Sequence, residues 1–130
     1  RVPPGGTAVQ ALEALRARAS QLERERAGVR IQLSALEGSI REPYVVPADS
    51  PVVQALQRAY RKATGSAAET GPGYSSGGLY HFHQLGVPGV YFGSGSIWNA
   101  HRENESVSVA ELVAMASTYA QLVHEVLGGE

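Results

Sequence analysis

Cysteine is absent from the chain, and aspartate is almost absent. Without cysteine the protein can form neither a disulfide framework nor a thiolate metal site, so any metal must be held by histidine and carboxylate side chains. The acidic residues are nearly all glutamates, and Asp49 is the single aspartate. A metal site built from this chain would therefore depend on its four histidines and on glutamate.

A surplus of positive charge and a long apolar run are also missing. The formal net charge is -1, and basic and acidic residues are interspersed, which argues against nucleic acid or an anionic membrane surface as a partner. No apolar run approaches the roughly 20 residues of a membrane-spanning helix, and the N-terminus lacks the pattern of a signal peptide. We therefore predict a soluble protein and expect it in the cytoplasm.

Methionine occurs once, as Met115, and the sequence opens with Arg1. Either the chain was cut from a longer polypeptide or an initiator methionine was removed. Its 130 residues and 43% hydrophobic content suffice for one globular domain and exclude a disordered or fibrous protein.

The first third of the chain predicts a helix followed by a strand. Thr7 is the expected N-cap, and the helix should run to about Arg26 and end before Gly28. Its expected buried stripe consists of Ala8, Leu12, Leu15, Ala19 and Leu22. Alternation over residues 29–33 predicts a half-buried strand. Residues 37–50 contain Gly38, Pro43 and Pro47 without periodicity and predict an extended connector between two structural units.

The remainder predicts two long helices around an irregular segment. Ser50 and Pro51 start a helix that should stop at Gly65. A loop rich in Gly, Ser and Ala covers 66–78, residues 79–85 fit a short helix or a strand, and residues 87–92 predict a buried strand. Ser108 and Glu111 form a capping box for a last helix that closes at Gly128. Its expected buried stripe consists of Leu112, Met115, Ala116, Tyr119, Leu122, Val123 and Val126.

The most informative segment follows the second predicted strand. Gly93-Ser94-Gly95 offers backbone N–H groups that can approach an anionic ligand, and His101 can present a ring nitrogen to a metal. These residues, with Leu85-Gly86-Val87-Pro88 before them and Ala100, Glu105 and the last helix after them, resemble the C-terminal part of a zinc metallohydrolase family. That family contains acetylornithine deacetylase, succinyl-diaminopimelate desuccinylase, aminoacylase and carboxypeptidase G. Arg1 with Pro4-Gly5 resembles the entry into the second helix of the family's dimerisation lid.

The resemblance implies an α/β fold. Residues 1–42 would be the second half of a ferredoxin-like dimerisation lid. Residues 43–130 would be the C-terminal segment of a zinc-exopeptidase-like catalytic domain, with a parallel or mixed sheet and flanking helices. The intact site would hold two zinc ions, with His101 as the last ligand of one ion. Gly93, Ser94, Gly95 and Asn99 would lie beside the substrate, and Glu105 would fix the loop.

The chain departs from the family pattern in its ligands. It contains no His-x-Asp motif and no Glu-Glu pair, so neither the general base nor the bridging carboxylate is present, and a catalytic zinc needs about three protein ligands. The aspartate expected before Leu85 is also missing, since Gly78 or Ser76 stands there. We therefore expect no catalytic residue in this chain. We expect a C-terminal fragment of an amidohydrolase or exopeptidase for N-acyl amino acids or small peptides. It should be inactive without the missing N-terminal catalytic portion, and a homodimer.

Two other functions stay open. The first is a non-catalytic interaction or dimerisation module that uses residues 29–33 as a pairing edge. The second is a stand-alone metal-binding protein built on His81, His83 and His101, which requires residues 79–85 to form a strand. His101 could also be a loop histidine bonded to backbone. His124 is interpreted as a structural residue of the last helix. Residues 23–26 are interpreted as a solvated helix end.

Overall fold

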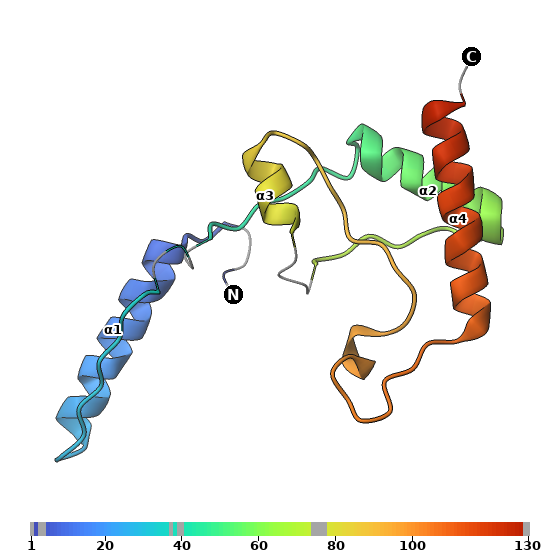
Figure 1. Ribbon diagram of the computed structural model, residues 1–130. Coiled ribbons are helices and arrows are strands. Elements are labelled where there is room, and N and C mark those ends of the chain that lie inside the picture. Colours follow the sequence, from blue (N-terminus) through green and yellow to red (C-terminus); the bar gives the residue numbers. More distant parts are fainter. Residues whose placement is uncertain (1, 3–4, 37, 39–40, 74–77, 129–130) are drawn as a thin grey trace. The chain divides into compact units, whose positions relative to one another are not determined.

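The computed structural model describes residues 2, 5–36, 38, 41–73 and 78–128 (Figure 1). Five elements follow one another: α1 (Ala8–Glu25), α2 (Pro51–Thr64), α3 (Leu79–Gln84), the 3-10 helix η1 (Ile97–Asn99) and α4 (Val109–Leu127). The chain divides into two compact units, residues 1–45 and 46–130. The interpretations of Arg1, Pro4 and Ser76 lie outside the described residues, as do parts of the predicted 37–50 connector. The assignment of residues 1–42 to a lid and 43–130 to a catalytic domain stays a prediction.

The predicted α/β fold is wrong for this structure. The described residues contain helices and irregular chain but no strand, so they form neither a parallel or mixed sheet nor half of a ferredoxin-like lid. Alternation predicts which side chains share a face, but a strand also needs a neighbouring strand that accepts its N–H groups. The N–H of Ile31 instead donates to a carboxylate oxygen of Glu23 at 2.8 Å. Residues 29–33 and 87–92 therefore remain unpaired as strands.

The first unit is one helix with the following segment attached to both of its ends. The Thr7 hydroxyl accepts the Gln10 N–H at 3.1 Å, and the Gln10 side chain accepts the Thr7 N–H at 3.0 Å. This capping box confirms the predicted start of α1. Glu23, in the last turns of α1, binds the N–H of Ile31, and Glu42 accepts the N–H of Ala8 at 2.9 Å. The chain after α1 therefore returns along the helix.

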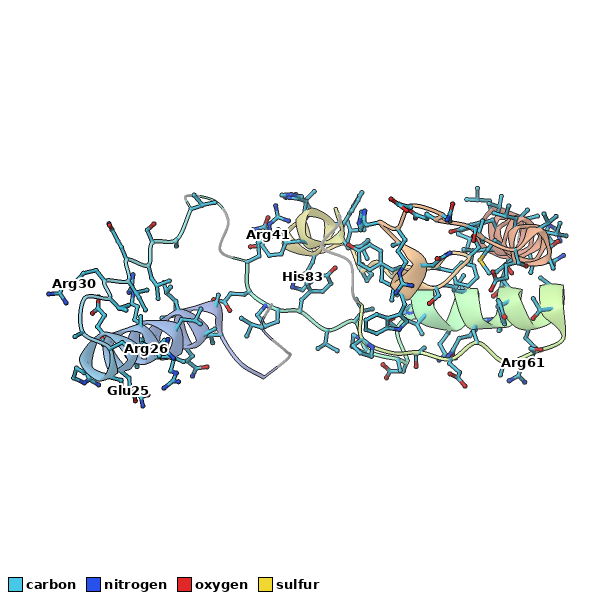
Figure 2. All side chains as sticks on the ribbon, turned by 90° about the horizontal axis from the view of Figure 1, so that it is seen from below. Glu25, Arg26, Arg30, Arg41, Arg61 and His83 are labelled. Atoms are coloured by element: carbon cyan, nitrogen blue, oxygen red, sulfur yellow. The ribbon has the colours of Figure 1, made fainter. Side chains whose placement is uncertain are left out.

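The predicted buried stripe of α1 is only partly confirmed. Ala19 is buried, whereas Leu15 keeps 58% of its surface exposed. Figure 2 shows Glu25, Arg26 and Arg30 around the C-terminal end of the helix, where all three are exposed. Glu25 and Arg26 therefore agree with the solvated helix end predicted for residues 23–26, whereas Glu23 is half-buried and accepts the Ile31 N–H.

The second unit is centred on α2 and α4, which lie side by side (Figure 1). α2 begins at Pro51 and ends at Thr64, and its C-cap is Gly65, whose left-handed backbone has φ +75°. α4 begins after Ser108, whose hydroxyl accepts the Glu111 N–H at 3.1 Å, and Gly128 is its C-cap. The predicted boundaries of both helices are confirmed, because caps and terminating glycines act locally.

In the contact between the two helices, α2 contributes apolar side chains and α4 contributes partly polar ones. α2 buries Val53, Ala55, Leu56 and Ala59. On α4 only Thr118 is fully buried, and its hydroxyl donates to the Ala114 carbonyl at 2.7 Å. The stripe predicted for α4 is therefore largely wrong. Four of its members keep 46% to 62% of their surface exposed, namely Leu112, Tyr119, Val123 and Val126.

Ion pairs connect the two helices at a second point. The Nε and Nη2 atoms of Arg58 each lie 2.6 Å from one carboxylate oxygen of Glu125, and Lys62 Nζ lies 3.8 Å from the other. The Glu125 side chain is only 18% exposed, whereas that of Arg58 is 57% exposed. A mostly buried carboxylate on α4 thus depends on cations supplied by α2.

An aromatic cluster attaches the irregular segment to this helix pair. The ring of Phe92 makes edge-to-face contacts with Tyr60 of α2 and Tyr119 of α4, at centroid distances of 5.9 and 5.6 Å. The Tyr119 hydroxyl also donates to the Phe92 carbonyl at 2.8 Å. The chain is therefore held in place directly before Gly93. Among the described helices, none is long and apolar enough to cross a membrane.

Candidate functional site

The candidate site is the loop that leads from Phe92 to α4. Gly93-Ser94-Gly95 follows the aromatic cluster, η1 comes next, and His101 lies between η1 and Ser108. Gly95 has φ +81°, and a methyl group added there would lie 3.5 Å from a methyl of Val107. Glycine thus allows the beginning of the loop to turn back beside its end.

Hydrogen bonds between polar side chains and backbone close the loop on itself. The Ser96 hydroxyl accepts the Trp98 N–H at 3.3 Å and so caps η1. The Asn99 side-chain amide donates to the carbonyl and hydroxyl oxygens of Ser106 at 2.7 and 3.2 Å. The Asn99 amide thereby connects the two sides of the loop, so this residue, predicted to lie beside the substrate, also shapes the loop.

His101 has an unusual backbone. Its φ is +61°, which makes it the one non-glycine residue with positive φ in the described part of the chain. A left-handed conformation costs an L-residue roughly 1–2 kcal/mol. The His101 N–H donates to the Glu105 carboxylate at 3.1 Å, and Glu105 therefore makes the loop-fixing contact expected of it. The side chain of His101 is exposed.

The loop encloses a shallow hollow of about 250 Å³. Its lining residues are Ser94, Gly95, Ser96, Asn99, Ala100, Glu105, Ser106 and Val107. Three of the four predicted substrate-binding residues thus meet at one surface, whereas Gly93 and His101 do not line it. Ser96 and Ser106 were missed, because their importance comes from the fold of the loop and serine alone carries no specific signal. The assignment of substrate contacts stays a prediction.

The described residues do not fit a metal by themselves. No group of three or more His, Asp or Glu side chains in the described part of the chain could hold an ion. His101 offers one imidazole, and the neighbouring Glu105 carboxylate accepts a backbone N–H instead. A catalytic metal needs about three protein ligands, so His101 could supply only one of a larger set.

The alternative three-histidine site required residues 79–85 to form a strand, and the structure does not contain that strand. Residues 79–84 form α3 and not a strand, so His81 and His83 stand about 200° apart around the helix axis. Figure 2 shows the side chain of His83 projecting from α3. Two histidines on different faces of one helical turn cannot bind the same ion.

Comparison with known proteins places the chain within a group of hydrolases. The family described as "Peptidase family M20/M25/M40" matches residues 6–125. An N-formyl-4-amino-5-aminomethyl-2-methylpyrimidine deformylase from Halalkalibacterium halodurans is 27% identical over 89 residues. The matched region covers 68% of this chain and 21% of that relative, so the chain spans about a fifth of the relative's length. No solved structure matches.

Proposed function

The chain belongs to peptidase family M20/M25/M40, and on this premise we propose that it supplies one wall of the active site of an amide-cleaving hydrolase. The family resemblance inferred from the sequence is confirmed. The family is generally metal-dependent. We propose an N-acyl amino acid, a small peptide or a related N-acyl compound as the substrate, and zinc as the metal.

The backbone of His101 is the observation that carries this proposal. Unfavourable backbone conformations persist where surrounding contacts impose them, and they cluster at functional sites. Here the Glu105 carboxylate holds the His101 N–H, and both Glu105 and the adjacent Ala100 line the hollow. A histidine fixed at such a position can present its ring to a metal without rearrangement of the loop. The loop itself would hold substrate through Ser94, Asn99 and backbone N–H groups.

We propose that the remaining ligands and the general base come from residues outside this chain. One imidazole cannot hold a catalytic metal, and the sequence contains no His-x-Asp motif or Glu-Glu pair. The matched relative is nearly five times longer than the region that aligns with it, which leaves room for those groups. The 130 residues alone are therefore expected to be inactive.

Hydrolysis assays on two polypeptides test the proposal. The first is the 130-residue chain, and the second extends it with the coding sequence that precedes Arg1. We expect hydrolysis of N-acyl amino acids or N-formyl amines only by the longer polypeptide. His101→Ala should lower its kcat/KM by at least about 100-fold, as loss of a metal ligand or its orienting partner does. His81→Ala is the control and should retain activity. Enzyme-like rates from the short chain alone, or full activity in His101→Ala, would contradict the proposal.

A non-catalytic interaction module is the second candidate, and the exposed apolar face of α4 favours it. Val113, Val123 and Val126 each keep 56% to 62% of their surface exposed. Apolar surface of this kind commonly marks a protein–protein contact. Self-association that survives His101→Ala, together with a lack of bound metal in the longer polypeptide, would favour this function over hydrolysis.

A further inference from the structure

A second hollow lies along α2, within the second unit. It has a volume of about 330 Å³ and is lined by Gln54, Gln57, Arg58, Arg61, Ala67 and Ala68. None of these residues is acidic, and none of them lines the hollow of the candidate loop. We propose that this second hollow binds the carboxylate group of a small molecule, at a site separate from the loop that carries His101.

The helical period and a fixed turn form the walls of the hollow. Positions i, i+3, i+4 and i+7 of a helix share one face, and the polar lining residues of α2 occupy such positions, namely Gln54, Gln57, Arg58 and Arg61. After the helix, the Ser66 N–H donates to the Thr64 hydroxyl at 3.2 Å, and that hydroxyl donates to the Tyr60 carbonyl at 2.8 Å. These bonds hold the turn that brings residues 67–68 to the hollow.

Arg61 supplies a positive charge to the hollow. Its side chain is exposed and forms no salt bridge or hydrogen bond with the residues that the structure describes. Figure 2 shows Arg61 near the C-terminal end of α2, pointing away from α4. Because the helix dipole stabilises a cation in the last turn, the guanidinium needs no carboxylate from this chain. Its fork of N–H donors matches the two oxygens of a ligand carboxylate.

The neighbouring carboxylates leave this charge uncompensated. Glu125 lies 2.6 Å from Arg58 Nη2 and 3.8 Å from Lys62 Nζ, so these two cations balance its charge. Glu69, which follows Ala68 in the sequence, is exposed and forms no ion pair within the described part of the chain. The hollow therefore presents one full positive charge, which repels metal ions and ammonium groups and attracts anions.

The glutamine side chains add uncharged donors beside Arg61. The Gln54 amide N–H groups donate to the Ala48 carbonyl at 2.8 Å and to the Gln57 side-chain oxygen at 3.4 Å. With its oxygen occupied in this way, Gln57 keeps its Nε2 atom as a donor for a ligand. One uncompensated guanidinium and one neutral amide suit the single charge of a carboxylate better than the double charge of a phosphate.

Titration of the 130-residue chain with matched probes tests the inference. Propionate and propionamide have nearly the same shape and differ in charge, and inorganic phosphate is the competing oxyanion. At constant ionic strength, propionate should shift the amide resonances of residues 54–68 and the Arg61 Nε–H resonance saturably. It should bind at least about fivefold more tightly than propionamide. A lack of saturable shifts, equal binding of propionamide, or tighter binding of phosphate would overturn the proposal.

Substitutions in the hollow separate charge from geometry. Arg61→Gln should weaken propionate binding by at least about fivefold, and Arg61→Lys, which keeps the charge without the fork, should have an intermediate effect. Gln57→Glu places a carboxylate in the hollow and should abolish binding. Arg16→Gln removes an exposed arginine from α1 and is the control, which should bind propionate normally. Normal binding in Arg61→Gln, or an equal loss in Arg16→Gln, would contradict the inference.

This inference does not depend on the proposed hydrolase function. His101→Ala should abolish hydrolysis in the longer polypeptide but leave propionate binding unchanged, because His101 does not line the second hollow. Loss of propionate binding in His101→Ala would mean that the carboxylate binds at the candidate loop, and the role of Arg61 would be refuted.

Discussion

At the scale of single residues, His101 combines an exposed imidazole with an unfavourable backbone conformation. The conformation depends on the Glu105 carboxylate, which holds the His101 N–H. Glycine adopts positive φ without the steric cost that a Cβ atom brings. Histidine at this position therefore makes the fold less stable than glycine would, and its imidazole accounts for its presence.

Replacing His101 by glycine and by alanine measures that cost. Both variants lose the imidazole, but only alanine keeps the Cβ atom that opposes φ +61°. We expect His101→Gly to have a free energy of unfolding about 0.5–1 kcal/mol higher than His101→Ala in denaturant titrations. The same pair of substitutions at Arg102, whose φ is not positive, should show the opposite order. The same order at both positions would mean that the backbone of His101 carries no strain.

The sequence predicts some of these residue-scale features and not others. Ser108 and Glu111 predict a capping box because the residue types and their spacing define this motif. His101 follows Ala100 in the family motif, which predicts its chemistry but not its backbone. Positive φ is uncommon for any residue other than glycine, even though histidine adopts it more often than most. The hydrogen bond from the His101 N–H to Glu105 that holds this conformation forms only once the loop has folded.

At the scale of elements, Tyr119 connects α4 to the start of the candidate loop. Its hydroxyl binds the Phe92 carbonyl, and its ring contacts the Phe92 ring. Tyr60 of α2 contacts the same ring, but within the described part of the chain no hydrogen bond of its hydroxyl accompanies that contact. Tyr119 therefore holds Phe92 through both its ring and its hydroxyl, whereas Tyr60 contacts Phe92 through its ring.

Tyr119→Phe is expected to loosen the loop while preserving the helices. Loss of the hydroxyl leaves the Phe92 carbonyl without this donor and should lower the free energy of unfolding by about 1 kcal/mol. Amide hydrogen exchange should accelerate at residues 93–95 and remain unchanged within α2. Tyr60→Phe keeps its ring contact and serves as the control. Equal protection of 93–95 in both variants would show that Tyr119 does not hold the loop.

The pair formed by Glu125 and Arg58 gives a second prediction for the helices. Glu125→Gln removes the charge that Arg58 and Lys62 meet, and because Arg58 is more than half exposed its guanidinium can be rehydrated. We therefore expect a loss of only about 1 kcal/mol in the free energy of unfolding, larger at low salt than at high salt. Glu103→Gln, an exposed change in the loop, should have a negligible effect. An effect of Glu125→Gln that does not vary with salt would exclude an electrostatic origin.

Helix boundaries were predictable from sequence, but helix faces and sheets were not. Pro51 and Gly65 act on their immediate neighbours and mark α2 correctly. The polar residues of α4, including Thr118 and Glu125, gather on the side that lies toward α2, so periodicity pointed to the opposite, apolar side as the buried one, where Val123 stays exposed. The sheet depended on pairing between distant segments, which alternation within one segment cannot establish.

At the scale of the whole molecule, the chain exposes more apolar side chains than a stable monomer usually does. On α4 alone, Leu112, Val113, Val123, Val126 and Leu127 are between 47% and 80% exposed. The apolar side of an amphipathic helix is normally buried against another element. We therefore propose that either a second copy or residues outside this chain cover this face.

Sedimentation of the isolated chain tests that expectation. We expect dimers or larger assemblies, and bound hydrophobic dye, because uncovered apolar surface promotes association. The double variant Val113→Lys, Val123→Lys should shift the chain toward monomer. Asn104→Lys adds an exposed charge in the loop before α4 and should leave the association unchanged. A thermally stable monomer without dye binding would contradict the expectation.

The distance along the chain between α2 and α4 has a consequence for how the second unit folds. Thr64 and Val109 enclose 44 residues, and α3 and η1 are the helical elements described between them. Closing a flexible loop of that length costs about 3 kcal/mol of chain entropy, and no contact between the two helices forms until it closes. The rate at which this unit folds should therefore be limited by the encounter of α2 with α4. A protease cut within 66–108 would slow refolding more than it would alter the helix pair once assembled.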